Sequence, residues 1–224
     1  MSGTLYVVGT PIGNLGDITL RALETLKAVD GIACEDTRQT LKLLVRYGFH
    51  KPLYTIFGPK EKRETPRILR LLEGGKSVAL VTDAGTPGIS DPGNFLVSQA
   101  RAQGVRIEPI PGASAAAALV SISGVSQDGF IFLGFLPRKL GKIKRELKSA
   151  SQLERAVVFY ESPYRTHATL AAAQEVFGAD AFCLVGRELT KKFEETLAGP
   201  LSQVIRELEG REILGEVSIL IKPS

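Results

Sequence analysis

Short apolar runs rich in β-branched residues alternate with segments of helical periodicity through the first half of the chain. The runs predict strands at Leu5–Gly9, Gly31–Cys34, Leu53–Phe57, Ser77–Thr82 and Val105–Ile110. Helical spacing between them predicts helices at Asp17–Val29, Arg38–Tyr47 and Asn94–Gln103, and a charged helix that starts with Thr65 as N-cap and Pro66 in its first turn. This βαβα order predicts a parallel sheet with helices on both of its faces.

The second half keeps the alternation after an Ala-rich helix predicted at Ala113–Ile122. A Gly- and Ser-containing stretch, Ser121–Gly129, follows that helix, so we expect two α/β domains, 1–120 and 121–224. Further strands are predicted at Phe130–Gly134, Ala156–Tyr160, Ala181–Gly186, Glu194–Leu197 and Val217–Ile221. Three more helices are predicted: one over the basic segment Arg138–Lys148, one from Ser162-Pro163 to Phe177, and one at Leu201–Leu208. The last connections are short enough for hairpins, which predicts a mixed sheet.

Composition is that of an ordinary globular protein, with 44% apolar and 23% charged residues among 224. Cys34 and Cys183 lie in apolar strand-like runs, which favours buried free thiols over a disulfide. The first residues lack a basic region followed by an apolar stretch, and no window of about 18 residues is apolar without charge. We therefore expect no signal peptide, no membrane span and a cytoplasmic location.

Charge changes this picture at one place only. The whole chain carries +4, whereas the segment Arg138–Lys148 carries +5, from six basic residues against the single acid Glu146. The basic residues are Arg138, Lys139, Lys142, Lys144, Arg145 and Lys148. A basic helix is often no more than a solvated face, but it is also what a phosphate-binding surface requires.

Three loops rich in Gly and Pro follow the first, fourth and fifth predicted strands. They are Gly9–Asp17, Asp83–Gly93 and Pro111–Ser114. Open α/β sheets bind ligands beyond the carboxyl ends of their strands, and glycine lets the backbone approach a ligand closely. Each loop taken alone is equally well a strand-to-helix turn. Three of them at strand ends favour a ligand site.

Several common site motifs do not occur in the chain. It has no G-x-x-x-x-G-K-[ST], no G-x-G-x-x-G after the first strand and no G-x-S-x-G. A nucleoside triphosphate, a dinucleotide in the usual fold and a serine hydrolase are therefore disfavoured. The only histidines, His50 and His167, lie far apart and neither neighbours a cysteine at metal spacing, so no metal site is expected.

Acidic side chains after several predicted strands are candidates for a general base. Glu35 and Asp36 follow the second strand, and Glu161 and Glu188 follow strands of the second half. Paired carboxylates can raise one pKa toward values suited to proton transfer. An ion pair or a helix cap explains Glu35 and Asp36 equally well, and Glu161 can instead orient Arg165. The catalytic candidates Glu35, Asp36 and Glu161 therefore remain unranked.

Seven segments occur together in a specific order. They are Gly9–Thr19 (GTPIGNLGDIT), Ala33–Arg38 (ACEDTR), Val81–Gly93 (VTDAGTPGISDPG), Pro109–Ala113 (PIPGA), Phe132–Arg138 (FLGFLPR), Phe159–Arg165 (FYESPYR) and Arg187–Lys191 (RELTK). With them the chain resembles, over nearly its whole length, the tetrapyrrole methylase superfamily, the class III S-adenosylmethionine methyltransferases. Within that superfamily it resembles the members that methylate ribosomal RNA of the small subunit.

The resemblance implies two α/β domains with S-adenosylmethionine in a cleft between them, and a homodimer. It also implies 2′-O-methylation of a decoding-centre cytidine in 16S rRNA, within the small ribosomal subunit. By the same analogy, Asp83 or its neighbouring amides hold the ribose or methionine part of the cofactor, although a loop cap is the alternative role for Asp83. The cofactor residues implied are Thr10, Pro11, Asp83, Ala84, Gly85, Thr86, Pro87, Ala113, Ser114 and Tyr160.

An RNA substrate gives the basic segment a role in binding phosphate. Stacking on an unpaired base is a candidate role for Phe135, Tyr160 and Tyr164, although core packing explains Phe135 nearly as well. The residues expected to contact RNA are Arg138, Lys139, Lys142, Lys144 and Arg145.

The sequence departs from the family pattern at three places. Tyr164 stands where a His is frequent, Leu214 stands where a Lys usually precedes Gly-Glu, and many members continue beyond the position of Ser224. The last departure bears on RNA affinity and substrate range. Two other functions remain open: methylation of a tetrapyrrole or diphthamide precursor, whose enzymes have a compact G-x-G-x-G-D first loop, and a module that binds S-adenosylmethionine without catalysis.

Overall fold

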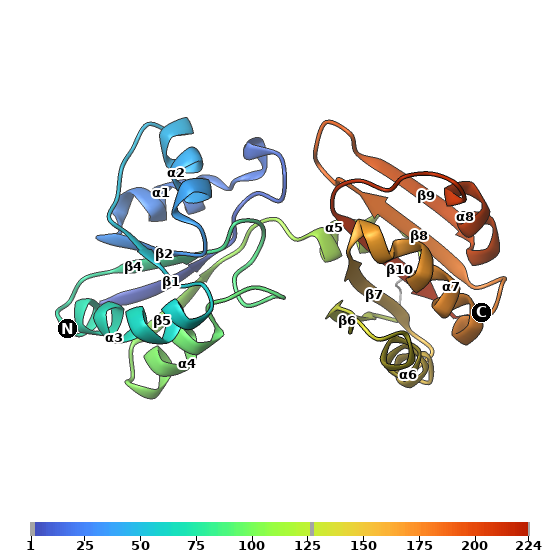
Figure 1. Cartoon of the computed structure of the whole chain (residues 1–224). Coiled ribbons are helices and arrows are strands. Elements are labelled where there is room, and N and C mark those ends of the chain that lie inside the picture. The colour runs from blue at the N-terminus through green and yellow to red at the C-terminus, as the bar shows by residue number, and fades with distance from the viewer. Residues whose placement is uncertain (1–2, 126–127, 224) are drawn as a thin grey trace. The chain divides into compact units, whose positions relative to one another are not determined.

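The computed structural model describes residues 3–125 and 128–223, and its contacts divide the chain into two compact units, Met1–Ser114 and Ala115–Ser224 (Figure 1). The observed boundary, after Ser114, comes six residues before the boundary expected after residue 120. Helix α5 (Ala115–Ser121), expected as the last helix of the first domain, packs instead on the sheet of the second unit.

The first unit is built on a five-stranded sheet with the order β3-β2-β4-β1-β5, in which every pairing is parallel. The strands are β1 (Thr4–Val8), β2 (Gly31–Cys34), β3 (Leu53–Thr55), β4 (Val78–Val81) and β5 (Arg106–Ile110). Strands β2 and β4 are buried along their whole length, as expected where helices cover both faces. The predicted parallel sheet is confirmed.

Helices cover both faces of this sheet. They are α1 (Leu20–Ala28), α2 (Thr37–Arg46), α3 (Pro59–Glu73) and α4 (Asn94–Ala102). Helices α1 and α2 contribute Leu26 and Leu44 to the core on one face, and α3 and α4 contribute Leu72 and Leu96 to the core on the other. The sheet is therefore the middle of three layers.

The predicted start of the first helix is wrong. A short 3-10 helix, Leu15–Asp17, ends where the helix was expected to begin. The Thr19 hydroxyl then caps α1 by accepting a hydrogen bond from the backbone N–H of Ala22 at 3.1 Å. The N-cap preference of threonine decides this position.

The predicted start of the charged helix is also wrong. Helix α3 begins at Pro59, and Thr65 and Pro66 lie inside it. Pro66 has no N–H to donate, and the Thr65 hydroxyl donates to the Glu61 carbonyl at 2.7 Å. A Thr-Pro pair is typical of a helix start, but burial of one helix face carries α3 through it.

The second unit contains a mixed sheet with the order β6-β7-β10-β8-β9. Its strands are β6 (Phe130–Phe135), β7 (Ala156–Glu161), β8 (Phe182–Arg187), β9 (Glu195–Pro200) and β10 (Val217–Lys222). Strands β6 and β7 are parallel, and the other pairings are antiparallel. The predicted mixed sheet is confirmed, and β9 runs three residues further than expected.

Three helices cover one face of this sheet and α5 covers the other. The three are α6 (Leu140–Ser151), α7 (Thr166–Phe177) and α8 (Leu201–Leu208). The Ser162-Pro163 pair does not start α7 directly, because a 3-10 helix, η2 (Pro163–Arg165), comes first and the Ser162 side chain caps nothing.

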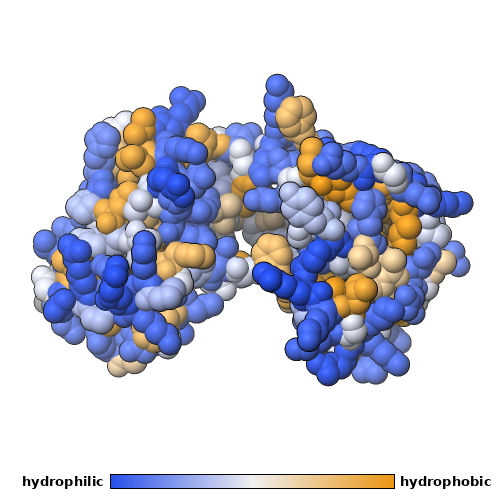
Figure 2. All heavy atoms as spheres, in the orientation of Figure 1, coloured by the Kyte–Doolittle hydropathy of each residue, from blue (hydrophilic) through white to orange (hydrophobic). Residues whose placement is uncertain are grey.

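Both cysteines are buried free thiols, as predicted. No helix in the described part of the chain is long and apolar enough to cross a membrane. Figure 2 shows hydrophilic residues over most of the visible face of each unit, with apolar side chains in scattered patches.

Candidate functional site

The three Gly/Pro-rich loops meet at one end of the parallel sheet, because the strands that they follow, β4, β1 and β5, are direct neighbours. We call these loops, Gly9–Asp17, Asp83–Gly93 and Pro111–Ser114, the loop cluster. Thr10 and Gly85 join the first two loops by a pair of backbone hydrogen bonds, with N–O distances of 2.8 and 3.2 Å. The buried Thr10 hydroxyl also donates to the Thr82 carbonyl at 3.1 Å.

The third loop joins the cluster by close backbone contact. A Cβ atom on Gly9 would come within 2.7 Å of the Gly112 nitrogen, and one on Gly112 would come within 2.7 Å of the Gly9 carbonyl. The Thr86 hydroxyl reaches the Ala113 carbonyl at 3.5 Å. All nine cofactor residues expected in the first unit therefore lie in loops that contact one another, with Thr10 and Gly85 buried among them.

The end of the second loop is held by a residue that sequence reasoning missed. Oε1 of Glu61, on α3, accepts hydrogen bonds from the backbone N–H groups of Gly93, Phe95 and Leu96 at 3.1 to 3.2 Å. Gly93 precedes α4 and offers no side chain to cap it. Glu61 supplies this cap from a neighbouring helix, and no local sequence signal marks it because its partners lie more than thirty residues away.

Three carboxylates gather at the ends of β2 and β4: Glu35, Asp36 and Asp83, of which Asp83 belongs to the loop cluster. The Asp83 side chain accepts from the Asp36 N–H at 3.0 Å, and the Glu35 side chain accepts from the Asp83 N–H at 3.4 Å. Partial burial raises the pKa of Glu35 and of Asp83, whose side chain stays accessible to solvent, and the neighbouring carboxylates add to the rise. The paired carboxylates that the sequence indicated thus become a group of three.

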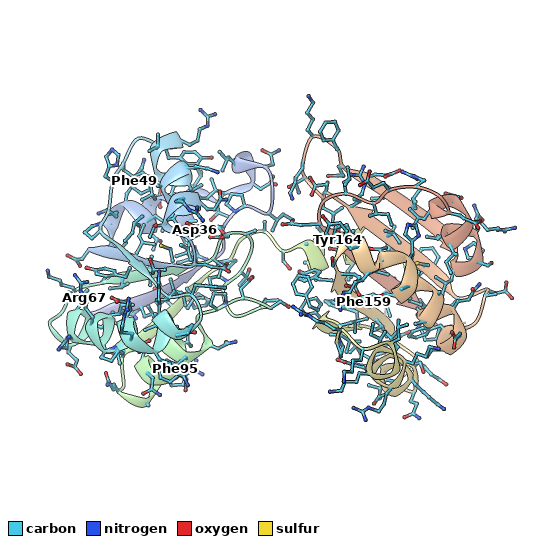
Figure 3. The ribbon with its side chains drawn as sticks, in the orientation of Figure 1. Asp36, Phe49, Arg67, Phe95, Phe159 and Tyr164 are labelled. Carbon is cyan, nitrogen blue, oxygen red and sulfur yellow. The ribbon has the colours of Figure 1, made fainter. Side chains whose placement is uncertain are left out.

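Asp36 is committed to another task within this group. Its side chain caps α2 by accepting from the Arg38 N–H at 2.8 Å and forms an ion pair with the Arg38 guanidinium at 2.6 Å (Figure 3). Hydrogen bonds from Arg38 hold the pKa of Asp36 at about 2. An ionised, doubly engaged carboxylate of this kind is a weak base, so the cap and ion pair weighed as alternatives both occur.

The Glu161 side chain is fully enclosed in the second unit. Its carboxylate accepts from the Ser162 N–H at 2.6 Å and the Thr169 hydroxyl at 2.7 Å, and pairs with Arg165 at 2.5 Å. With no exposed surface it cannot meet a substrate hydroxyl in this conformation. The geometry favours the alternative role, in which Glu161 orients Arg165.

Tyr160 and Glu188 are likewise engaged inside the second unit. The Tyr160 hydroxyl accepts from the Ala116 N–H at 3.2 Å, and its ring packs against Phe132. Glu188 adopts a left-handed backbone with φ 51° and pairs with Lys191 at 2.8 Å, which lowers the pKa of Glu188. Contacts with other residues of the second unit thus fix the positions of both side chains.

The basic segment forms α6 and the turn before it, as predicted. Arg138, Lys139, Lys142 and Arg145 are exposed or partly exposed and form no ion pair with the described residues. Lys144 differs, because its ammonium pairs with Glu175 of α7 at 2.5 Å. Four of the five residues expected to contact RNA therefore present an unneutralised charge.

The described residues do not bring side chains together into a metal-binding cluster. Within residues 3–125 and 128–223, no three or more His, Cys, Asp or Glu side chains gather in a way that could hold a metal ion.

Comparison with known proteins identifies relatives over the whole chain. The family model described as Tetrapyrrole (Corrin/Porphyrin) Methylases matches residues 4–205. A protein named Ribosomal RNA small subunit methyltransferase I from Thermotoga maritima is 45% identical over 220 residues, 98% of each chain. The protein of the same name from Bacillus subtilis is 43% identical over 222 residues, which cover 99% of this chain and 76% of that one.

Solved structures with little sequence identity share the fold. A diphthine synthase superposes with a TM-score of 0.75 at 15% identity, covering 98% of this chain and 90% of that one. The cobalt precorrin-4 methyltransferase CbiF gives 0.72 at 18% identity, with coverages of 98% and 94%. With the family match over residues 4–205, these findings show that the chain belongs to the tetrapyrrole (corrin/porphyrin) methylase family.

Proposed function

We propose that this protein uses S-adenosylmethionine to methylate the 2′-hydroxyl of a decoding-centre cytidine in 16S rRNA. The observation that carries the proposal is the 45% identity, over 98% of both chains, to a protein named for methylating small-subunit ribosomal RNA. The loop cluster supports it independently, because it lies at the end of a parallel sheet where folds of this kind bind their ligands.

The loop cluster has the chemistry to hold the cofactor. The backbone N–H groups of Ala84 and Thr86 donate to no acceptor within the described chain, so they can donate to a ligand. Asp83 is exposed beside them, and its carboxylate can accept from ribose hydroxyls or the methionine ammonium. Bound S-adenosylmethionine supplies a methyl group on a positively charged sulfur. The task left to the protein is to position the reacting atoms.

Glu35 is the carboxylate that we propose as a base for the ribose hydroxyl. Asp36 is held ionised by Arg38 and Glu161 is enclosed, whereas Glu35 is half-buried and forms no ion pair with the described residues. Burial raises its pKa, and a general base works best when its pKa lies near the operating pH. The prediction is that E35Q lowers kcat more than it raises KM for either substrate.

A methyl-transfer assay tests the proposed function. Small ribosomal subunits that lack the modification are incubated with the protein and S-adenosylmethionine carrying a labelled methyl group. We expect label in 16S rRNA, on a nucleotide whose 3′-phosphodiester bond resists alkaline cleavage because its 2′-oxygen is methylated. Label in a corrin precursor or a diphthamide intermediate, with none in RNA, would assign the protein to the alternative substrates.

Calorimetry with S-adenosylmethionine separates an enzyme from a binding module. We expect one cofactor per chain, with methyl transfer at the same protein concentration. Binding without transfer to any of the three substrate classes would favour the module.

We also propose a homodimer that acts in the cytoplasm, where a bacterial small subunit is assembled. Sedimentation equilibrium measures the mass directly and is expected to give twice the 24.1 kDa of one chain.

A further inference from the structure

Two strongly exposed aromatic side chains lie at one edge of the second unit. Phe135, the last residue of β6, is 60% exposed, and Tyr164, in η2 directly after β7, is 90% exposed. Strands β6 and β7 are parallel neighbours, so their carboxyl ends, where the two residues lie, are at the same end of the sheet. Figure 3 shows Tyr164 at this end of the unit, near the start of α7.

A β-bulge directs Phe135 to this position. Phe132 pairs with Val158 and Phe135 pairs with Tyr160, so β6 holds one more residue than β7 between the two pairs. Gly134 in the bulge has φ 65°, a conformation that favours glycine. Bulges re-aim side chains and occur frequently beside functional sites. Here the bulge sets the Phe135 ring edge-on to Tyr160, with centroids 5.5 Å apart, and leaves most of the ring exposed.

One guanidinium group ties the two aromatic segments together. Arg165 follows Tyr164 and donates to the carbonyls of Leu136 and Pro137, which follow Phe135, at 3.2 and 3.1 Å. The enclosed Glu161 carboxylate holds Arg165 in place. Both exposed rings are therefore anchored on stiff backbone, which reduces the entropy lost when a ligand is bound.

Positive charge adjoins the two rings. Arg138 and Lys139 come three and four residues after Phe135, are exposed and form no ion pair with the described part of the chain. Aromatic side chains beside unpaired cations are the arrangement with which proteins bind single-stranded nucleic acid, because bases stack on rings and phosphates meet the cations.

We infer that Phe135 and Tyr164 form a stacking platform for unpaired bases of the RNA substrate, with Arg138 and Lys139 on the adjoining phosphates. The inference rests on the proposed function for the identity of the substrate, and it adds the residues that hold the RNA in a single-stranded form. The basic helix alone would bind a duplex as well as a single strand, whereas a stacking platform requires unpaired bases.

Fluorescence tests the platform directly, because the chain contains no Trp. The variant F135W carries the only indole, and titration with single-stranded oligocytidylate RNA is expected to quench it. The matched control is F193W, since Phe193 is 65% exposed in the loop between β8 and β9, at the sheet edge opposite β6. Equal quenching of both variants, or equal quenching by duplex RNA, would overturn the inference.

Methylation kinetics on unmodified small subunits give a second readout. We expect F135L and Y164L each to raise KM for RNA about tenfold, with kcat and cofactor affinity near wild type, because stacking energy is lost in binding. F135W is expected to restore the wild-type KM, and F193L to leave it unchanged. An unchanged KM in F135L and Y164L would overturn the inference. Variants that lose the dimer but keep their RNA affinity would overturn it as well.

The experiments distinguish failure of the proposed function from failure of the stacking inference. If the wild-type protein transfers no methyl group to small-subunit RNA, the proposed function is wrong. If it does so while the platform variants behave as wild type, only the stacking inference is wrong.

Discussion

Gly9 and Gly112 show how single residues shape the loop cluster. Each leaves no room for a side chain, because a Cβ on either would lie 2.7 Å from the other's backbone. The absence of two side chains thus lets the loop after β1 and the loop after β5 touch. At the carboxylates beside them, by contrast, the environment of each side chain decides its role, since Glu35 and Asp36 are neighbours in sequence with pKa values shifted in opposite directions.

Substituting Gly112 by Ala tests the backbone contact. The added methyl group must push two rigid backbone segments apart, so G112A is expected to lose about 1–3 kcal/mol of unfolding free energy and to weaken cofactor binding. Gly141 is the control, because it lies in α6 with nothing within 4 Å of an added Cβ. G141A is expected to gain up to about 1 kcal/mol from helix propensity. Urea denaturation and calorimetry measure both effects, and equal stabilities would contradict the packing argument.

The raised pKa of Glu35 predicts a pH dependence of stability. Because burial makes the folded chain hold this proton more tightly than the unfolded chain, the free energy of unfolding falls as pH rises from the unfolded pKa to the raised folded pKa and stays lower above it. E35Q removes this loss and is expected to be more stable than wild type at neutral pH. Urea denaturation between roughly pH 4 and pH 7 measures it. E24Q, at an exposed carboxylate of α1, serves as control, and parallel curves for E35Q and wild type would refute the assignment.

Whole elements are positioned by contacts between helices as much as by the sheet. Glu61 on α3 caps α4 and thereby fixes the residue at which the second loop of the loop cluster ends. In the second unit, Arg165 fixes the segment that leads from β6 into the basic helix. Both contacts join segments distant in sequence, and both set where a loop begins or ends.

Removing the Glu61 carboxylate should loosen the Asp83–Gly93 loop, which we propose binds the cofactor. E61A leaves three backbone N–H groups without their acceptor, so we expect a loss of about 1–2 kcal/mol in stability and a weaker affinity for S-adenosylmethionine. E61Q keeps an acceptor oxygen and should recover part of both. Glu64 provides the control on the same helix, since it pairs only with Arg63 and Arg67 among the described residues. An E64A variant as impaired as E61A in cofactor binding would show that the cap has no special role.

At the scale of the molecule, charge is distributed unevenly. Ion pairs neutralise most acidic strand-end residues of the second unit, whereas the exposed cations of the basic segment other than Lys144 remain unpaired within the described chain. The surface of α6 is therefore more positive than the net charge of +4 indicates. An RNA that approaches this unit gains counterion release chiefly there.

The salt dependence of RNA binding tests this surface. The double variant K142Q/R145Q removes two unpaired cations and should weaken RNA binding. The slope of log Kd against log salt concentration should fall by roughly 0.7 for each RNA phosphate that is no longer neutralised. Cofactor affinity should not change. K144Q is expected to have a smaller effect per residue, because Glu175 already neutralises Lys144. Filter binding at several salt concentrations measures the slopes, and an unchanged slope in the double variant would locate the RNA elsewhere.

Much of the architecture was determined by sequence alone. Alternation of apolar runs with helical periodicity predicts both sheets, because strand and helix patterns depend on neighbouring residues. The position of the three loops at strand ends follows from the same pattern. Helix starts at Asp17 and Thr65 were predicted wrongly. At the first helix the Thr19 cap decides the start. At α3, burial of one helix face carries the helix through the local Thr-Pro signal.

Only the tertiary structure decided what each charged side chain does. Glu35, Asp36 and Glu161 look alike in sequence as acids at strand ends, but one is half-buried, one is paired with Arg38 and one is enclosed with Arg165. Glu61 carries no sequence signal at all, because its partners lie on another helix. Local pattern determines elements, whereas burial, ion pairing and close backbone approach depend on residues that the chain brings together only when it folds.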